Sequence, residues 1–316
     1  MSDLRHDTVT FLSDYGTADG FVGVVHSVIR QMAPGVGIVD LTHEIAPFDV
    51  RGGSLVLARA VQFLCPGVIV AAVDPGVGTA RRAVAIEIAG GDAVLVGPDN
   101  GLLAAAAAMV GGADRAVVLD DPEYHLATGA TTFDGRDVFA PVAAHLCLGV
   151  ELADLGTEIS TSGLMPGLVP LTRTEDGVVT AEVLWVDRFG NVQLNLDPDE
   201  IADWGDQVVV QIGERRRVAR RVRSFADVGP GGLGLLVDSD GLGALVADRS
   251  SAAEELALVP GDQVDLTAVG DEPRGPDVVA SPVELGRRAP TSDPTSTDPT
   301  SPDPTSTDLT STKEKA

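Results

Sequence analysis

The sequence contains very little lysine and few aromatic residues. Both lysines, Lys313 and Lys315, stand close to its last residue, so arginine supplies every positive side chain of the remaining chain. Aromatic residues make up 4% of the sequence, and small aliphatic residues must therefore fill most of the core. The formal net charge is −25 at pH 7. We expect no binding to nucleic acids or to anionic membranes, since both require basic surfaces; a cationic small molecule suits this chain better.

Cysteine is also scarce, and no stretch of the chain is apolar for long. The two cysteines, Cys65 and Cys147, stand in apolar surroundings (QFLCPG and AHLCLG), and we expect both to be buried thiols in a reducing compartment. No apolar run reaches the roughly 18 residues that cross a membrane. The opening residues, MSDLRHDT, are too polar for a signal peptide. These absences favour a cytoplasmic protein.

The most informative stretch is residues 68–82, VIVAAVDPGVGTARR. Its apolar start is long enough for a buried strand and too short for most helices, and it ends on Asp74. After the turn at Pro75 and Gly76, Arg81 can return and pair with this carboxylate. Alone, Asp74 would more often cap a turn than bind a ligand. The order of strand, acidic residue and turn recurs, however, which predicts a rim of aspartates where open α/β sheets bind ligands: Asp14, Asp49, Asp74, Asp99 and Asp134.

Strands and helices alternate through the first half of the chain. We expect strands at 8–13, 36–41, 68–73, 84–88, 93–97 and 116–119, and helices at 21–32, 53–64, 102–109 and 138–148. This order predicts an α/β fold in which an N-terminal α/β domain, residues 1–165, holds a mostly parallel sheet. Short β-rich runs in residues 171–283 predict a C-terminal antiparallel β-barrel domain. Residues 289–316 repeat Ser, Thr, Asp and Pro, and we expect this tail to be disordered.

Six segments together resemble the S-adenosyl-L-methionine hydrolase family (adenosine-forming), also called SAM hydroxide adenosyltransferases, the sister group of the fluorinase and chlorinase. The segments are FLSDYGTADGFVGVVHSVI, DLTHEIAPFDV, VDPGVGTARR, GPDNGLL, TTFDGRDVFAPVAAHL and VDRFGNVQLN, and the likeness spans roughly residues 8–266. The resemblance implies an α/β domain followed by a β-barrel domain, in a homotrimer with active sites between subunits. It also implies hydrolysis of S-adenosyl-L-methionine to adenosine and L-methionine.

The resemblance further implies which residues are catalytic. The family's reaction displaces methionine from the 5′ carbon of ribose, and in its hydrolases an Asp, an Arg and a His hold and activate a water. Asp74 and Arg81 match the first two, an arrangement that the halogenases lack. The family's TFHGRD motif reads TFDGRD here, so Asp134 takes the place of the His. A carboxylate can accept a proton from water, especially where burial or a neighbouring acid raises its pKa.

The resemblance also implies a set of substrate contacts. Asp14 would bind the ribose hydroxyls, and Phe48 would lie against the ribose. Phe189, Asn191 and Phe225 match adenine-pocket positions, where rings stack on the base and an amide reads its edge. Asp187 matches a carboxylate that binds the methionine ammonium, and Ser239 matches a residue near the methionine carboxylate. Arg249 lies where backbone groups meet adenine.

Several alternatives remain open from the sequence. A non-catalytic S-adenosylmethionine or adenosine binder is favoured by the change at Asp134, and a halide in place of water would make the protein a 5′-halo-5′-deoxyadenosine synthase. A metal-dependent phosphohydrolase is a more remote class, because the chain has neither a P-loop nor a DxD motif on its first strand. We expect His43 and His145 to be structural, since neither has a partner at metal-binding spacing in the sequence. The reaction would require neither a metal nor a redox cofactor.

Overall fold

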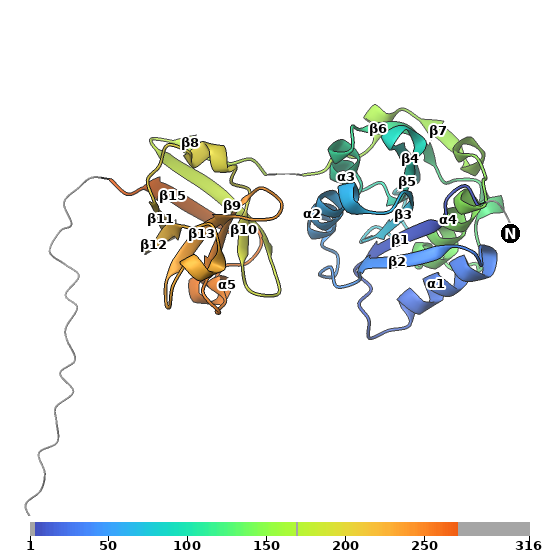
Figure 1. The fold of residues 1–316 in the computed structure, drawn as a ribbon. Coiled ribbons are helices and arrows are strands. Elements are labelled where there is room, and N and C mark those ends of the chain that lie inside the picture. Colours follow the sequence, from blue (N-terminus) through green and yellow to red (C-terminus); the bar gives the residue numbers. More distant parts are fainter. Residues whose placement is uncertain (1–3, 169, 271–316) are drawn as a thin grey trace, which may run out of the picture. The chain divides into compact units, whose positions relative to one another are not determined.

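The computed structural model describes residues 4–168 and 170–270 (Figure 1). The tail predicted to be disordered, and the last part of the predicted barrel domain, lie outside the described residues. Two β-sheets organise the described chain, the first built by β1 to β7 and the second by β8 to β15. Among the described residues, no helix combines the length and the apolar character needed to cross a membrane.

The first sheet has the strand order β2-β1-β3-β5-β4-β6-β7. Strands β2, β1, β3 and β5 run parallel, whereas β4 is antiparallel to both β5 and β6, and β7 is antiparallel to β6. The sheet is therefore mixed, and only one half of it has the parallel pairing expected from the sequence. Its strands are β1 (Thr8–Ser13), β2 (Gly37–Thr42), β3 (Gly67–Ala72), β4 (Ala83–Ile88), β5 (Ala93–Pro98), β6 (Ala113–Val118) and β7 (Thr157–Ile159).

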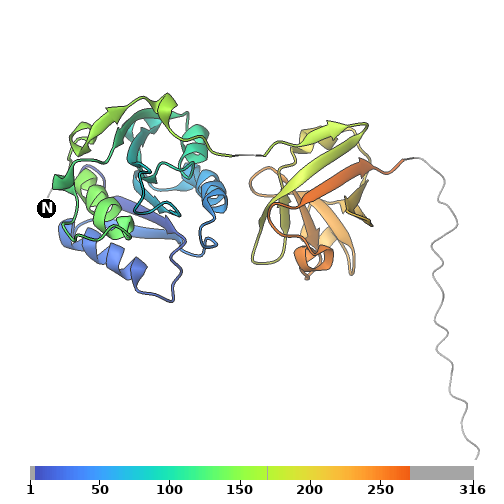
Figure 2. The same ribbon diagram turned by 180° about the vertical axis from the view of Figure 1, so that it is seen from behind.

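Helices cover both faces of this sheet (Figures 1 and 2). Helix α1 (Phe21–Met32) packs beside α4 (Ala140–Cys147) on one face, and α2 (Val50–Ala60) packs beside α3 (Ala104–Met109) on the other. Strand β3 is buried along its whole length, and its side chains alternate between the two cores. Val68 and Val70 join the core under α1 and α4, whereas Ile69 and Ala71 join the core under α2 and α3. The carboxyl end of β3 is consequently fixed from both sides.

The second sheet closes into a barrel. Seven strands follow one another in the order β10-β14-β13-β12-β11-β15-β9, and the pairing of β9 with β10 closes the ring; β8 adds to β9 outside it. All pairs are antiparallel except β12 with β13. The elements are β8 (Arg173–Glu175), β9 (Val178–Val186), β10 (Val192–Leu194), β11 (Gln207–Ile212), β12 (Arg215–Arg221), β13 (Leu233–Val237), β14 (Gly243–Ala247), α5 (Ala252–Leu256) and β15 (Gln263–Ala268).

The two cysteines differ in their surroundings. Both thiols are free, but Cys65 is exposed and only Cys147 is buried. Cys65 lies in the loop between a short 3-10 helix, Val61–Phe63, and β3, so its apolar neighbours in the sequence do not enclose it. The prediction that it is buried was wrong. Burial in α4 raises the pKa of the Cys147 thiol to about 12, which keeps that thiol protonated and unreactive.

Candidate active site

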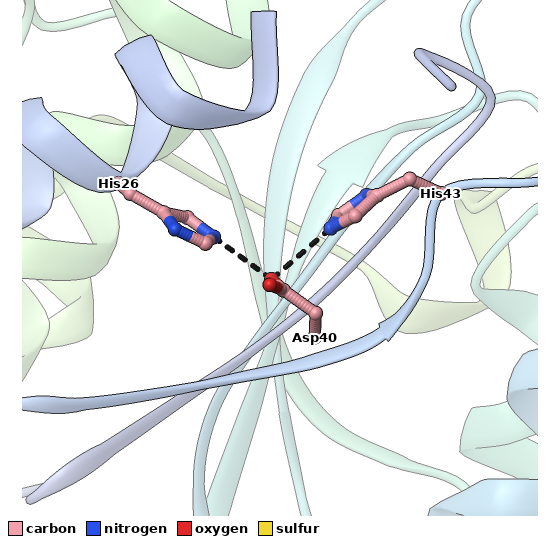
Figure 3. Close-up of side chains that lie close together, drawn as sticks. All are labelled: His26, Asp40 and His43. Atoms are coloured by element: carbon pink, nitrogen blue, oxygen red, sulfur yellow. Dashed lines mark hydrogen bonds and ion pairs between the residues drawn. The ribbon is translucent and has the colours of Figure 1, made fainter. Parts of the chain in front are cut away.

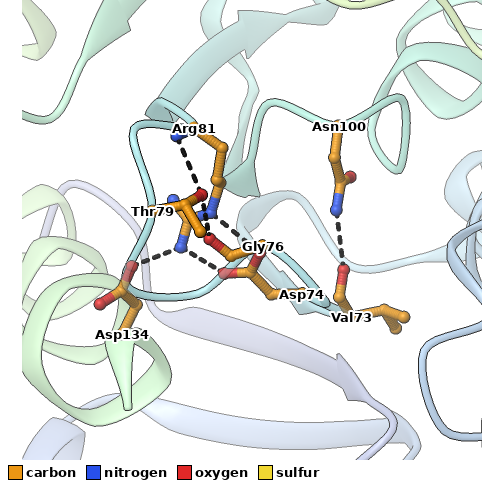
Figure 4. A network of polar contacts seen from close by, with 7 residues as sticks. All are labelled: Val73, Asp74, Gly76, Thr79, Arg81, Asn100 and Asp134. Carbon is orange, nitrogen blue, oxygen red and sulfur yellow. Dashed lines mark hydrogen bonds and ion pairs between the residues drawn. The ribbon is translucent and has the colours of Figure 1, made fainter. Parts of the chain in front are cut away.

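The turn after β3 places Asp74 and Arg81 side by side (Figure 4). The backbone reverses through hydrogen bonds from the Val77 N–H to the Asp74 carbonyl (3.2 Å) and from the Thr79 N–H to the Gly76 carbonyl (3.2 Å). The Thr79 hydroxyl donates to the same Gly76 carbonyl (2.6 Å) and accepts from the Arg81 N–H (3.3 Å). The threonine thus fixes the last residues of the turn, and the arginine returns to the aspartate as the sequence predicted.

Arg81 connects two carboxylates from distant parts of the chain. Its Nε donates to Asp74 Oδ1 at 2.9 Å, and its Nη2 donates to both Asp74 Oδ2 and Asp134 Oδ2 (Figure 4). The exposed fraction of the side chain is 12% for Arg81, 9% for Asp74 and 21% for Asp134. The Arg81 guanidinium also lies over the ring of Phe139, 5.6 Å from its centroid. Two carboxylates and one guanidinium thus form a partly buried cluster whose formal charge is −1.

Close packing joins this turn to the segment that carries Asp134. Gly78 has φ +77°, and a Cβ there would lie 2.8 Å from the Thr131 carbonyl oxygen. Only glycine meets both conditions without strain. After Asp134 the chain enters a π-helical turn, Gly135–Phe139, which leads directly into α4. Such single π turns often occur at functional sites, because they aim side chains that a regular helix would direct elsewhere.

Tyr15 is a central residue that the sequence analysis did not identify. Its ring contacts Phe133 edge-on, with centroids 5.7 Å apart, and a Cβ on Gly135 would overlap its hydroxyl. Burial raises the pKa of the Tyr15 phenol well above its ordinary value, and three nearby carboxylates raise it further: those of Asp14, Asp74 and Asp134. The phenol therefore stays protonated, and three of the predicted aspartates lie near enough to this side chain to raise its pKa.

Asp14 and Phe48 form a second part of this rim. The Phe48 N–H donates to Asp14 Oδ2 at 2.9 Å, which fixes the carboxylate between β1 and the loop before α2. Phe48 has φ +69° and an exposed fraction of 71%. A large side chain held outward in the left-handed region is strained, and such strain is often found where a ligand binds. The next residue, Asp49, begins α2 by accepting the Gly52 N–H at 2.8 Å.

Two of the five predicted rim aspartates have structural contacts instead. Asp49 is the helix cap just described. Asp99 is buried, accepts Arg82 Nη2 on one oxygen and accepts the Met165 N–H on the other at 2.8 Å. Its acceptor atoms are already used to hold a loop against the sheet. Asp99 follows β5, the parallel neighbour of β3, so strand order puts it at the same edge as Asp74; its bonds to Arg82 and Met165 set it apart.

The barrel carries most of the other predicted contacts. A hollow of about 860 Å³ is lined by Asp187, Phe189, Asn191, Phe225 and Arg249, so five residues chosen from the sequence line one groove. The Asp187 carboxylate shapes this groove: it accepts the Phe189 N–H (2.8 Å), the Asn191 N–H (2.9 Å) and the Asn191 side-chain amide (2.7 Å). The loop is thereby held so that Phe189 projects outward, with an exposed fraction of 78%.

Ser239 lines an adjoining hollow of the barrel rather than the groove itself. Asp187, Asn191 and Phe225 border both spaces, so the two hollows share part of their walls. Trp185 and Asp238 line the second hollow with Ser239, and the sequence analysis did not identify either. No local motif marks these residues, because strands β9 and β13 bring them together only when the barrel closes.

Known proteins are similar to both halves of the chain. Residues 9–156 match the SAM hydroxide adenosyltransferase N-terminal domain, and residues 181–265 match the SAM hydroxide adenosyltransferase C-terminal domain. An (R)-S-adenosyl-L-methionine hydrolase from Salinispora arenicola is 48% identical over 264 residues, covering 82% of this chain and 97% of the relative. A protein of the same name from Thermus thermophilus is 41% identical over 266 residues, covering 82% and 98%.

A solved structure is also similar along nearly its whole length. The crystal structure of an uncharacterized conserved protein from Thermotoga maritima aligns with a TM-score of 0.75 at 34% identity, covering 82% of this chain and 99% of that one. Both domains of the family thus match in order, and the matches span nearly the full length of these relatives. The chain belongs to the SAM hydroxide adenosyltransferase family.

Proposed function

We propose that this protein hydrolyses S-adenosyl-L-methionine to adenosine and L-methionine. Relatives named for this activity are 41% to 48% identical and are matched over nearly their full length. The observation that carries the proposal for this chain is the bridge from Arg81 to Asp74 and Asp134. It keeps two proton acceptors beside one fixed donor at the end of a buried strand.

The main task of the protein in this reaction is to position a water molecule and to accept its proton. The water oxygen forms a bond to ribose C5′ while the C5′–S bond breaks and its electron pair stays on sulfur. The sulfonium leaves as a neutral thioether, so no general acid is required. A proton must leave the water, and Asp74 or Asp134 accepts it while the other remains paired with Arg81. Positioning and partial desolvation of the water supply the rest.

The excess negative charge of this cluster also suits the substrate. A sulfonium is cationic, and it is attracted to a partly buried site where carboxylates outnumber guanidinium groups. Asp14 would accept the ribose hydroxyls, as a carboxylate with two oxygens can. The same negative charge would repel a halide ion. This favours water as the nucleophile over the halogenase alternative.

We further propose that the protein works as a homotrimer, with the barrel groove holding adenine and methionine beside a neighbouring subunit. Phe48, Phe189 and Phe225 have exposed fractions of 71%, 78% and 51%. Exposed aromatic residues beside a groove are typical of surfaces that a ligand or a partner covers. No metal or cofactor takes part in the proposed reaction. The two free cysteines fit a reducing compartment such as the cytoplasm.

Adenosine formation tests the proposal directly. Purified protein is incubated with S-adenosyl-L-methionine, and adenosine is followed by chromatography against the spontaneous rate, with the Asp134→His variant and a chelator-treated sample alongside. We expect adenosine from the natural protein, unchanged by the chelator. Concentrated chloride should yield no 5′-chloro-5′-deoxyadenosine.

One second function is favoured by a specific residue. Because Asp134 replaces the family's histidine, a binder without turnover is the alternative. It predicts tight calorimetric binding and no adenosine from the natural protein, with activity gained in Asp134→His. Absence of both binding and turnover in both proteins would refute the substrate assignment itself.

A further inference from the structure

Three side chains that are not part of the Arg81 cluster converge on one point (Figure 3). His26 comes from α1, Asp40 from β2, and His43 from the turn that follows β2. The Nε2 atoms of His26 and His43 both point at the same carboxylate oxygen, Asp40 Oδ1, at 2.8 Å and 3.0 Å. One ligand atom from each residue lies within 4.8 Å of the others. The fold thus assembles a compact set of two imidazoles and one carboxylate.

The His43 ring is held rigidly in this arrangement. The side chain is 5% exposed, and its ring lies 4.7 Å from that of Phe11. Its Nδ1 is 2.8 Å from the hydroxyl of Ser13, which is fully buried. The hydroxyl can accept a proton from Nδ1, and metal binding requires that tautomer, in which the other ring nitrogen carries the lone pair. With the proton on Nδ1, the Nε2 of His43 is a lone-pair donor, and it faces Asp40.

That nitrogen has no hydrogen-bond partner of its own within the described chain. His43 Nε2 is buried, and its approach to Asp40 lacks the alignment of a hydrogen bond. A nitrogen lone pair and a carboxylate oxygen repel each other unless a proton or a cation lies between them. A buried polar atom left unpaired in this way destabilises the fold. His26 Nε2 already forms a hydrogen bond with Asp40 Oδ1, and a cation between the three ligands would replace that bond and satisfy His43 Nε2 as well.

The ligand types define which cation fits. Imidazole nitrogen is a good ligand for Zn²⁺ and neighbouring transition metals, whereas Mg²⁺ and Ca²⁺ prefer oxygen alone. Metal–ligand distances of about 2.0–2.2 Å place tetrahedral ligand atoms about 3.3 Å apart. The observed separations of 2.8 Å and 3.0 Å need only a small opening. The His26 and Asp40 side chains are 29% and 42% exposed, so water can reach a fourth position.

We propose that His26, Asp40 and His43 bind one divalent transition-metal ion of the Zn²⁺ class. The ion joins α1 to the end of β2, and through Ser13 it supports the strand end that precedes Asp14. Its role is to stabilise this corner of the fold, and it takes no part in attack on the substrate. The site is therefore independent of the proposed hydrolysis.

Cobalt titration tests the site with a spectroscopic signal. Chelator-treated protein carrying Cys65→Ser, which removes the exposed thiol, is titrated with Co²⁺ while its visible absorption is recorded. We expect one Co²⁺ per chain, displaced by Zn²⁺. His26→Gln and Asp40→Asn should each weaken Co²⁺ binding at least tenfold, whereas the matched control His145→Gln, outside the cluster, should not. Both replaced side chains are partly exposed, so the variants should remain folded.

A second readout is the melting temperature. Zn²⁺ should raise the Tm of the natural protein and leave that of His26→Gln unchanged, since a ligand that binds only the native state stabilises it. Absence of Co²⁺ binding at millimolar concentration, or equal binding by His26→Gln, Asp40→Asn and the control, would overturn the proposal. Adenosine formation is measured on the same samples, so failure of the metal site and failure of the proposed hydrolysis are distinguishable.

Discussion

Arg81 and Arg82 are neighbours in the sequence, and each pairs with an aspartate at the end of a strand, but the two sites differ in charge and in unused acceptors. The Arg82 site balances one guanidinium against Asp99, whose oxygens are both occupied by protein donors. The Arg81 site sets one guanidinium against two carboxylates. A balanced, saturated pair can only hold structure, whereas an unbalanced cluster retains capacity for a proton and attraction for a cation. The net charge of such a site and the carboxylate oxygens that no protein donor occupies therefore distinguish a structural ion pair from a candidate catalytic one.

The largest difference in kcat between the two sites should follow from replacing one aspartate of each site by asparagine. Asp74→Asn should lower kcat about 100-fold or more, because it removes a proton acceptor and weakens the hold on Arg81. Substrate binding measured by calorimetry should change much less. Asp99→Asn should keep kcat within about twofold and instead lower the free energy of unfolding by about 1–3 kcal/mol, since it disturbs a buried hydrogen-bonded group. Equal losses of kcat in the two variants would remove the distinction between the sites.

The two arginines give a second test, with a smaller expected effect. Lysine keeps the charge but cannot present the flat set of N–H groups that Arg81 uses on two carboxylates. Arg81→Lys should lower kcat about 10-fold, corresponding to about 1.4 kcal/mol of transition-state stabilisation. Arg82→Lys should leave kcat unchanged and lower Tm slightly, because the Arg82 side chain is 37% exposed. Steady-state kinetics beside thermal melts separates the effects, and a loss of kcat in Arg82→Lys would contradict them.

The contact between Gly135 and Tyr15 offers a test on the Arg81 side alone. A methyl group at position 135 would overlap the Tyr15 hydroxyl and approach two ring carbons at 3.1 Å and 3.2 Å. Gly135→Ala should therefore displace Tyr15 or Asp134 and lower kcat several-fold, up to about 10-fold. Adding Tyr15→Phe removes the hydroxyl overlap and should restore part of the activity. If the double variant is no better than Gly135→Ala, the hydroxyl does not set this spacing.

Local sequence predicted the Arg81 site better than it predicted the sheet around it. Asp74 and Arg81 were found because one strand and one turn determine their approach. The antiparallel placement of β4 was missed, although only residues 89–92 separate it from β5, and parallel neighbours need a crossover of about a dozen residues. The start of α2 was placed at residue 53 because Asp49 was interpreted as part of a turn, when it is the helix cap.

Contacts between distant segments were beyond local reasoning. The recurring order of strand, acidic residue and turn placed Asp134 on the predicted rim, but only the family resemblance gave it a catalytic role, since no spacing rule connects it with Asp74. Tyr15 and the partnership of His26 with His43 were missed for the same reason: each depends on where a helix or loop packs, and neither forms a recognisable motif. The barrel's groove residues likewise came from the resemblance. Their assembly in one hollow follows from strand pairing, which periodicity alone does not determine.

The smallest expected effect concerns pH and probes how far the excess charge near Arg81 extends. Burial lowers the pKa of His125 below its ordinary value of 6.5, and the charge of Asp134 opposes that shift. As pH falls through 6.5, the unfolded chain takes up a proton at this residue before the native chain does, so the native state loses stability.

His125→Gln should therefore reduce the decline of the urea midpoint between pH 7.5 and pH 5.5. It should not abolish the decline, because burial also lowers the pKa of His6 and His145. Asp134→Asn should act in the opposite direction and make the decline steeper, since it removes a charge that favours protonated His125. Arg82 and Asp99 offer the matched comparison: Asp99→Asn removes a carboxylate that is not among the charges acting on His125, and it should leave the slope unchanged. The same slope in Asp134→Asn and Asp99→Asn would show that the excess charge of the Arg81 cluster does not extend to His125.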